Sequence, residues 1–398
     1  MEKECLHRLL NAMRRLPAVV QARVLPVLLT ALLCVSCSKD KQVLTGEGDG
    51  MLPLSVNFRM TVPMDASAAD SPEYNDDRTW GDDYNQENAL SAENRILWDD
   101  FSVAFFSEND NSYIGHLRDI HCINLLPGVD MATYECKGVL TTTEDMKAEE
   151  LVEKLRSSGK VRTLVIANVK TEQKTLEAGI SGADAGLGAM EYSCNGLFNI
   201  DFPAIPMFGI TTNDFSGLTL GKSVDLGKVA LLRSVAKVEV LVSEELQQAS
   251  GNTIKLTSVS VSRMNTTGYV LPGNWNNIDK TEKLKFSETL RIPEPATKEE
   301  DKTFSVRDDG RVLFYLPECR NGSGDDEIVL TVNYTVEDEA REGIIHLCDY
   351  SNGNPDRENL WDVVRNHLYR YIITNSGEIK FKVEVHPWDE VEIPEIMM

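Results

Sequence analysis

Hydrophobic side chains that recur at every second position are the feature that most restricts how this chain can fold. The pattern runs through residues 52–62, 328–334 and 379–385, where apolar and polar residues alternate. Successive side chains of a β-strand point to opposite faces of a sheet, so each segment predicts a half-buried strand. Several such strands with turn signals between them predict a mostly β protein built from β-sandwiches.

Other segments complete this picture. One long strand is expected over 228–242, and shorter strands are expected at 98–107, 113–117, 161–169, 254–262, 312–316, 343–347 and 368–374. The segments 368–374 and 379–385 would form a terminal hairpin. A single well-marked helix is expected over 142–156, with Thr142 and Asp145 as a capping box and Gly159 at its end.

The N-terminus has the three zones of an export signal. Residues 1–23 are basic, residues 24–35 are apolar, and Ser36 and Cys37 then precede a polar run. The apolar zone is shorter than the roughly 20 residues that span a bilayer as a helix, which makes a retained membrane anchor the weaker interpretation. A cysteine after a small residue favours lipid attachment at Cys37. Cys34 stands where the usual lipoprotein motif has leucine, and an ordinary cleaved signal with an incidental Cys37 is the alternative.

Length and charge limit the organisation and the partners. The chain has 398 residues and a net charge of −23. The prediction is a signal peptide (1–36), a flexible tether (37–50), an N-terminal β-sandwich domain (51–220) and a C-terminal one (221–398). An acidic surface of this size repels nucleic acid, so no nucleic-acid partner is expected.

The cysteines beyond Cys37 are widely spaced and odd in number, which is unlike a disulfide framework. Buried free thiols are therefore the favoured interpretation. A disulfide between Cys122 and Cys136, or between Cys319 and Cys348, is the alternative.

No constellation for chemistry stands out. His116 and His121 are spaced poorly for a metal pair, and no nucleophile or zinc motif is present. The chain is therefore predicted not to be an enzyme and to need no metal or cofactor. Trp80 and Trp275 fall in expected loops, where they could stack on a sugar or simply close the end of a sandwich.

Four short motifs resemble the fimbrillin family of type V pilin-like fimbrial lipoproteins. They are 231–238 (LLRSVAKV), 365–369 (RNHLY), 387–389 (PWD) and 205–207 (IPM). Their order and spacing, together with the export signal, match the family layout. We interpret Arg233 in the first motif as structural, because a charged side chain in an apolar strand needs hydrogen-bond partners. Asn366 and Tyr369 of the second motif are interpreted in the same way.

The resemblance implies two tandem transthyretin-like β-sandwich domains with few short helices. It also implies an outer-membrane lipoprotein that is exposed on the cell surface and assembled with other subunits into a pilus, or fimbria. In this family a surface protease cuts after Arg or Lys in the N-terminal region, the first strand leaves, and a strand of another subunit replaces it.

This sequence has candidates for each of these parts. Segment 52–62 is the removable strand, and Arg78 in the polar loop after it is the expected cut, with Arg59 and Arg95 as rivals. The expected donor strand carries four alternating apolar residues, Ile379, Phe381, Val383 and Val385. An intact first strand and an ordinary terminal hairpin are the structural alternative. The functional alternative is a monomeric surface lipoprotein that binds a host or glycan receptor through Trp80 or Trp275.

Overall fold

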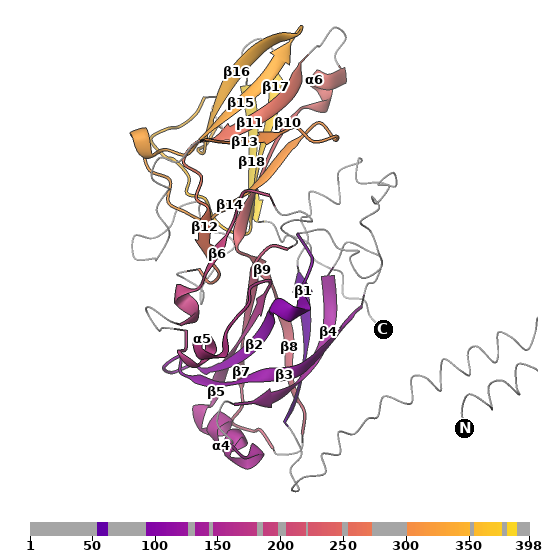
Figure 1. The fold of residues 1–398 in the computed structure, drawn as a ribbon, viewed down its shortest axis with the longest axis vertical. Coiled ribbons are helices and arrows are strands. Elements are labelled where there is room, and N and C mark those ends of the chain that lie inside the picture. The colour runs from indigo at the N-terminus through magenta and orange to yellow at the C-terminus, as the bar shows by residue number, and fades with distance from the viewer. Residues whose placement is uncertain are drawn as a thin grey trace, which may run out of the picture. The chain divides into compact units, whose positions relative to one another are not determined.

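A computed structural model describes residues 54–62, 93–125, 132–142, 146–180, 186–197, 204–219, 222–248, 254–272, 301–350, 354–375 and 380–387. The chain divides into two compact units, Met1–Met51 and Leu52–Met398, and every described residue belongs to the second. The described residues are mostly β-strands with few short helices, which confirms the predicted fold class (Figure 1).

The larger sheet has eight strands in the order β8-β1-β4-β3-β2-β5-β7-β9. Neighbouring strands are antiparallel except for β1 and β8, which run parallel. The strands are β1 (Ser55–Val62), β2 (Phe101–Ser107), β3 (Tyr113–Asn124), β4 (Ala132–Thr141), β5 (Lys160–Ala167), β7 (Met207–Asp214), β8 (Val224–Ala230) and β9 (Leu232–Arg233).

This sheet folds over on one core. Val229 of β8 and Met207 of β7 come from strands far apart in the sheet order, yet both belong to the same buried cluster. The two strands approach closely at Gly209, where a Cβ atom would lie 2.6 Å from the carbonyl oxygen of Ala230. Only glycine fits there, because any side chain would collide with the backbone of β8. The result is a sandwich-like arrangement made from a single sheet.

The main helix, α4 (Ala148–Ser158), covers this core with Leu151, Val152 and Leu155. It starts later than predicted. Lys147 is its N-cap, and the Lys147 N–H donates to the Glu150 carboxylate at 3.3 Å, so the predicted cap at Thr142 is wrong. Gly159 ends the helix with φ +65°, as predicted. The other helices are α5 (Gln173–Glu177), α6 (Glu244–Gln248) and the 3-10 turns η2 (Trp98–Asp100), η3 (Leu187–Ala189) and η4 (Gly324–Asp326).

Two four-stranded sheets make the second sandwich. One has the order β14-β10-β17-β18 and the other β13-β11-β15-β16, and inward residues of both belong to one buried cluster. The strands are β10 (Val235–Val242), β11 (Lys255–Val261), β13 (Lys302–Ser305), β14 (Val312–Pro317), β15 (Val329–Val336), β16 (Glu339–His346), β17 (His367–Asn375) and β18 (Lys380–Pro387). A separate pair joins β6 (Glu191–Ser193) to β12 (Thr267–Tyr269).

The long strand predicted over 228–242 is divided. β8 and β9 pair within the eight-stranded sheet, whereas β10 pairs with β14 and β17. The chain changes sheets at Ser234, whose N–H donates to the carbonyl of Pro206 at 2.8 Å. The period-two pattern continues through this point, so it could not reveal the change of partner. The domain boundary near residue 220 stays a prediction, and β8 and β9 lie beyond it.

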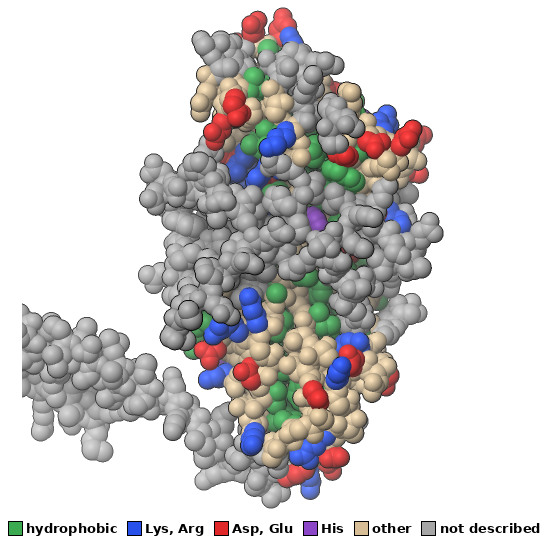
Figure 2. Space-filling view, turned by 180° about the vertical axis from the view of Figure 1, so that it is seen from behind, with side chains coloured by type: hydrophobic (Ala, Val, Ile, Leu, Met, Phe, Trp, Pro, Cys, Tyr) green, Lys and Arg blue, Asp and Glu red, His purple; other side chains and the backbone are tan. Residues whose placement is uncertain are grey.

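Acidic and basic side chains are interspersed among the described residues on the face that Figure 2 shows. None of the helices within the described ranges is long and apolar enough to cross a membrane.

Candidate functional site

The first strand lies inside a sheet rather than at its edge. β1 pairs along its length with β4, from Ser55 opposite Val139 to Val62 opposite Ala132, and its other side pairs with β8. A strand with neighbours on both sides has both rows of backbone hydrogen-bonding groups satisfied. Any strand that took its place would have to satisfy the same two neighbours.

One face of β1 is fully packed. Three alternate side chains of β1, Val56, Phe58 and Met60, together with Leu54 just before the strand, are at most 2% exposed and belong to the core of the eight-stranded sheet. The intervening Arg59 is exposed. The strand therefore offers apolar side chains to the core and polar ones to the surface, as the alternation predicted.

A disulfide fastens the neighbour of β1. Cys122 of β3 and Cys136 of β4 lie opposite each other, with their Cα atoms 4.2 Å apart, and are bonded. Cys136 also lies opposite Phe58 of β1. The favoured interpretation of these two thiols as free was wrong, and the alternative bridge is present, because positions 14 residues apart in sequence lie opposite each other in the antiparallel register of β3 and β4. Cys194, Cys319 and Cys348 are buried free thiols, as predicted.

Among the described strands, the expected donor strand β18 lies at the edge of its sheet. It pairs antiparallel with β17, which places Phe381, Val383 and Val385 opposite Ile373, Tyr371 and Tyr369. The three partners on β17 are buried, and Val383 packs against the same cluster. Val383 is thus directed to its own sandwich. Ile379 lies outside the described residues.

Other predicted residues also fall outside the described part of the chain, namely Cys37, Arg78, Trp80 and Trp275. Among the residues that are described, no group of three His, Cys, Asp or Glu side chains could hold a metal ion.

The RNHLY motif (365–369) is structural. Arg365 is 3% exposed and makes two contacts with the fully buried Glu318, one of them an Nε–Oε2 hydrogen bond of 2.7 Å. Its guanidinium also donates to the carbonyl of Val270 at 2.6 Å. Asn366 accepts from the Arg233 N–H at 3.1 Å. The Tyr369 hydroxyl donates to the carbonyl of Asp362 at 2.8 Å. These bonds hold the start of β17.

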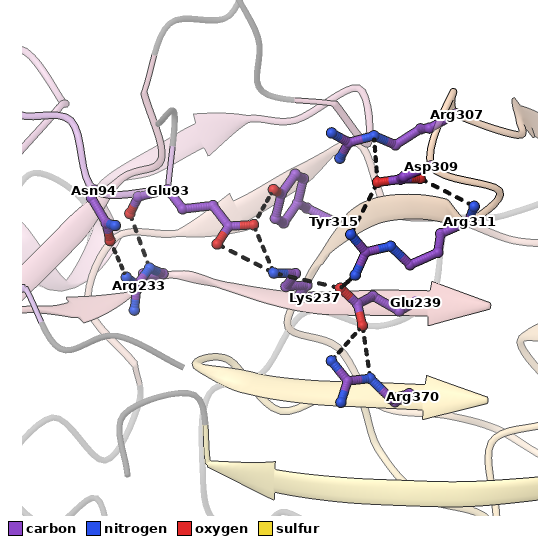
Figure 3. A network of polar contacts seen from close by, with 10 residues as sticks. All are labelled: Glu93, Asn94, Arg233, Lys237, Glu239, Arg307, Asp309, Arg311, Tyr315 and Arg370. Carbon is purple, nitrogen blue, oxygen red and sulfur yellow. Dashed lines mark hydrogen bonds and ion pairs between the residues drawn. The ribbon is translucent and has the colours of Figure 1, made fainter. Parts of the chain in front are cut away.

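The buried side chain of Arg233 is bound by a loop that lies far from it in the sequence. Its Nε donates to the carbonyl of Glu93 at 3.0 Å, and Nη2 donates to the Oδ1 of Asn94 at 2.6 Å (Figure 3). Arg233 is only 1% exposed. The loop before β2 and the strand β9, some 140 residues apart in sequence, are thereby joined.

Glu93 starts a network of buried charges along β10. Its carboxylate lies 3.0 Å from the Lys237 ammonium and accepts from the Tyr315 hydroxyl at 2.5 Å (Figure 3). Burial works against ionisation of Glu93, but the charges of Lys237 and Arg233, together with hydrogen bonds from Tyr315 and Lys237, outweigh it and lower the pKa of the carboxyl. Glu93 is therefore an anion at neutral pH. Burial likewise raises the pKa of Tyr315 well above its usual value, so this phenol stays protonated and donates.

A second carboxylate continues the network. Glu239 lies between Lys237, Arg311 and Arg370, at 3.7, 3.9 and 2.8 Å. Burial again opposes ionisation, and these three cations again lower the pKa of Glu239. The network extends through Arg311 to Asp309, as Figure 3 shows. Alternating charges of this kind fix the relative positions of their strands, and they offer no nucleophile or proton-transfer pair.

The sequence indicated the first strand and the terminal hairpin but not this network. Its carboxylates lie among many others in an acidic chain, and its members come from segments up to 222 residues apart. The only sequence signal was the cation of Arg233 within an apolar strand.

In overall fold the chain is similar to solved fimbrial proteins. One is the tip fimbrial protein Mfa3 from Porphyromonas gingivalis with C-terminal truncation, at 13% identity and a TM-score of 0.49. That match covers 84% of this chain and 100% of the other. Another is a fimbrial assembly protein from Parabacteroides distasonis, at 15% identity and a TM-score of 0.44, which covers 84% and 99%. No protein-family model and no curated protein matches the sequence. Fold alone does not assign a function.

Proposed function

We propose that this protein is a structural and adhesive subunit of a surface pilus. It is exported as a lipoprotein through Cys37 and held at the outer membrane. Proteolytic removal of β1 then opens its place in the sheet, and a strand from another subunit fills that place. The position of β1 between β4 and β8, with one face fully buried, is the observation that carries the proposal.

Removal of β1 would leave a site in the sheet that fits another β-strand. β4 and β8 would each lose a row of backbone partners, and unpaired backbone groups of a sheet template the addition of another strand. Leu54 and the three buried side chains of β1 together contribute on the order of 6–12 kcal/mol by burial alone. An incoming strand that restores both the backbone hydrogen bonds and the apolar burial would be bound tightly.

The pattern of β18 suits this site. Ile379, Phe381, Val383 and Val385 repeat the spacing of Leu54 and the three buried residues of β1. β18 has a single neighbour among the described strands, so its release breaks one ladder, whereas release of β1 breaks two. A donor role requires β18 to leave its own sandwich, and its edge position favours that step.

Trypsin treatment of the lipidated precursor tests the proposal. Cleavage after Arg78, a new N-terminus at Thr79 and SDS-resistant ladders are expected. A stable monomer that binds glycan arrays and loses binding in Trp80→Ala or Trp275→Ala would overturn it in favour of a monomeric adhesin.

The donor assignment has its own test. Phe381→Asp combined with Val383→Asp should abolish the ladders, because both residues share the apolar register of β18. Lys382→Asp, on the exposed face of the same strand, is the matched control and should leave the ladders intact. Unchanged ladders in the double variant would reject β18 as the donor.

A further inference from the structure

Segment 93–97, which lies just before η2 and β2, is bound to the rest of the protein at both of its ends. At the downstream end the side chain of Asn168, which follows β5, binds the backbone of the segment. Asn168 Nδ2 donates to the carbonyl of Arg95 at 2.9 Å, and the Leu97 N–H donates to Asn168 Oδ1 at 2.8 Å. Asn168 adopts φ 66°, a conformation that asparagine tolerates better than most residues. This end of the segment is therefore fixed to the eight-stranded sheet.

At the upstream end, the segment is fixed by charge. Arg233 binds the Glu93 carbonyl and the Asn94 side chain, and the Glu93 carboxylate binds Lys237 and Tyr315 (Figure 3). Lys237 lies on β10 and Tyr315 on β14, so this end is fixed to the sheet β14-β10-β17-β18.

The buried cations make the upstream contacts costly to lose. Arg233 and Lys237 are 1% and 6% exposed. Loss of the Glu93 carboxylate removes the nearer of two carboxylates beside the Lys237 ammonium, at 3.0 Å against 3.7 Å for Glu239. Removal of a partner from a buried charge destabilises a protein far more than loss of a surface pair. A molecule cut downstream of Asn94 would lose the Glu93 carboxylate and the Asn94 amide together.

We propose that residues 93–97 form a permanent clasp that remains after N-terminal processing and sets the downstream limit of the segment that a protease can remove. This inference rests on the proposed removal of β1. Processing is the hydrolysis of one peptide bond by a protease specific for basic residues. Water supplies a hydroxyl to the new carboxyl terminus and a hydrogen to the new amine.

The clasp restricts which basic residue is cut. A protease needs an extended, unpaired backbone, and ordered hydrogen-bonded backbone resists it. Arg59 lies in β1 with paired strands on both sides. Arg95 lies in the clasp, with its carbonyl bound by Asn168. Of the three candidate arginines, Arg78 alone lies outside both β1 and the clasp.

Limited trypsin digestion of the folded full chain, followed by N-terminal sequencing and intact mass, tests this inference. No fragment is expected to begin at Ile96, the residue that follows Arg95. In the variant Glu93→Ala/Asn94→Ala, cleavage after Arg95 should become about 100-fold faster or more, since loss of a buried charge pair opens the segment. Glu108→Ala, in the turn after β2, is the matched control and should leave that cleavage slow.

A second measurement covers the case in which the double variant does not fold. In the wild-type protein the Leu97 amide should exchange its hydrogen slowly both before and after trypsin treatment. Wild-type cleavage after Arg95 at the rate of the urea-unfolded chain, or rapid Leu97 exchange after processing, would overturn the clasp. The two proposals can fail separately. If the clasp persists but no ladders form, only strand addition is rejected. If ladders form from fragments cut after Arg95, only the clasp is rejected.

Discussion

The substitution Phe58→Ala tests whether processing removes β1 from the protein or leaves it in the sheet. Phe58 is 2% exposed, and it lies in β1 opposite the fully buried Cys136. Truncation of a buried phenylalanine to alanine costs about 3–5 kcal/mol, through lost burial and the cavity left behind. The uncut precursor should lose that much in free energy of unfolding. The processed protein should be unaffected, because residue 58 is no longer part of it.

The assay is urea unfolding of the wild type and the variant, each before and after trypsin treatment. Arg59→Ala is the control, since its side chain is exposed on the same strand and surface substitutions usually change stability by less than about 0.5 kcal/mol. An equal loss of stability before and after trypsin would mean that the cut strand stays in the sheet. No loss in the precursor would mean that β1 is not packed as described. Either result refutes the reasoning.

Three further predictions concern stability and use urea or thermal unfolding. Glu318→Gln should destabilise the protein by about 3–5 kcal/mol, because it leaves Arg365 buried beside a neutral group; a loss below 1 kcal/mol would contradict the buried pair. Burial alone would raise the pKa of Glu239, but the surrounding cations lower it below the ordinary 4.5. The contribution of Glu239 to the free energy of unfolding should therefore be full above pH 4.5 and disappear as the pH falls through the lower pKa of the folded state. Glu239→Gln should flatten that part of the stability profile. Reduction of the Cys122–Cys136 bridge, which closes a short loop, should cost about 3 kcal/mol, and a Cys122→Ser/Cys136→Ser variant should then be insensitive to reductant.

Local patterns were enough to predict most strands. The terminal hairpin was expected from segment 368–374 and the alternation over 379–385, and the structure has β17 and β18 in those places. Alternation reports which face of a strand is buried, and that depends only on neighbours along the chain. The partner of a strand depends on residues far away. The parallel pairing of β1 with β8, and the change of sheet at Ser234, therefore left no mark on the pattern.

The buried charges were unpredictable for the same reason. Tyr315 and Glu93 are 222 residues apart, and in the sequence Glu93 looks like any other carboxylate of an acidic chain. Arg233 was the exception, because an arginine within a largely apolar segment requires hydrogen-bond partners. Even there, the sequence could not say that the partners would be Glu93 and Asn94.

The two parts of the N-terminal region are held by different forces, and this difference explains how one could leave while the other stays. β1 is held by backbone ladders and four apolar side chains, which any strand with the same alternation can reproduce. The clasp is held by Glu93 and Asn94 against Arg233 and Lys237, contacts that require those side chains in that geometry. A one-residue slip of an incoming strand would turn its apolar residues to the surface, so the vacated site still selects register. Strand exchange is thus favoured at β1, where many sequences can make the same contacts, and residues 93–97 stay fixed because their contacts require particular side chains.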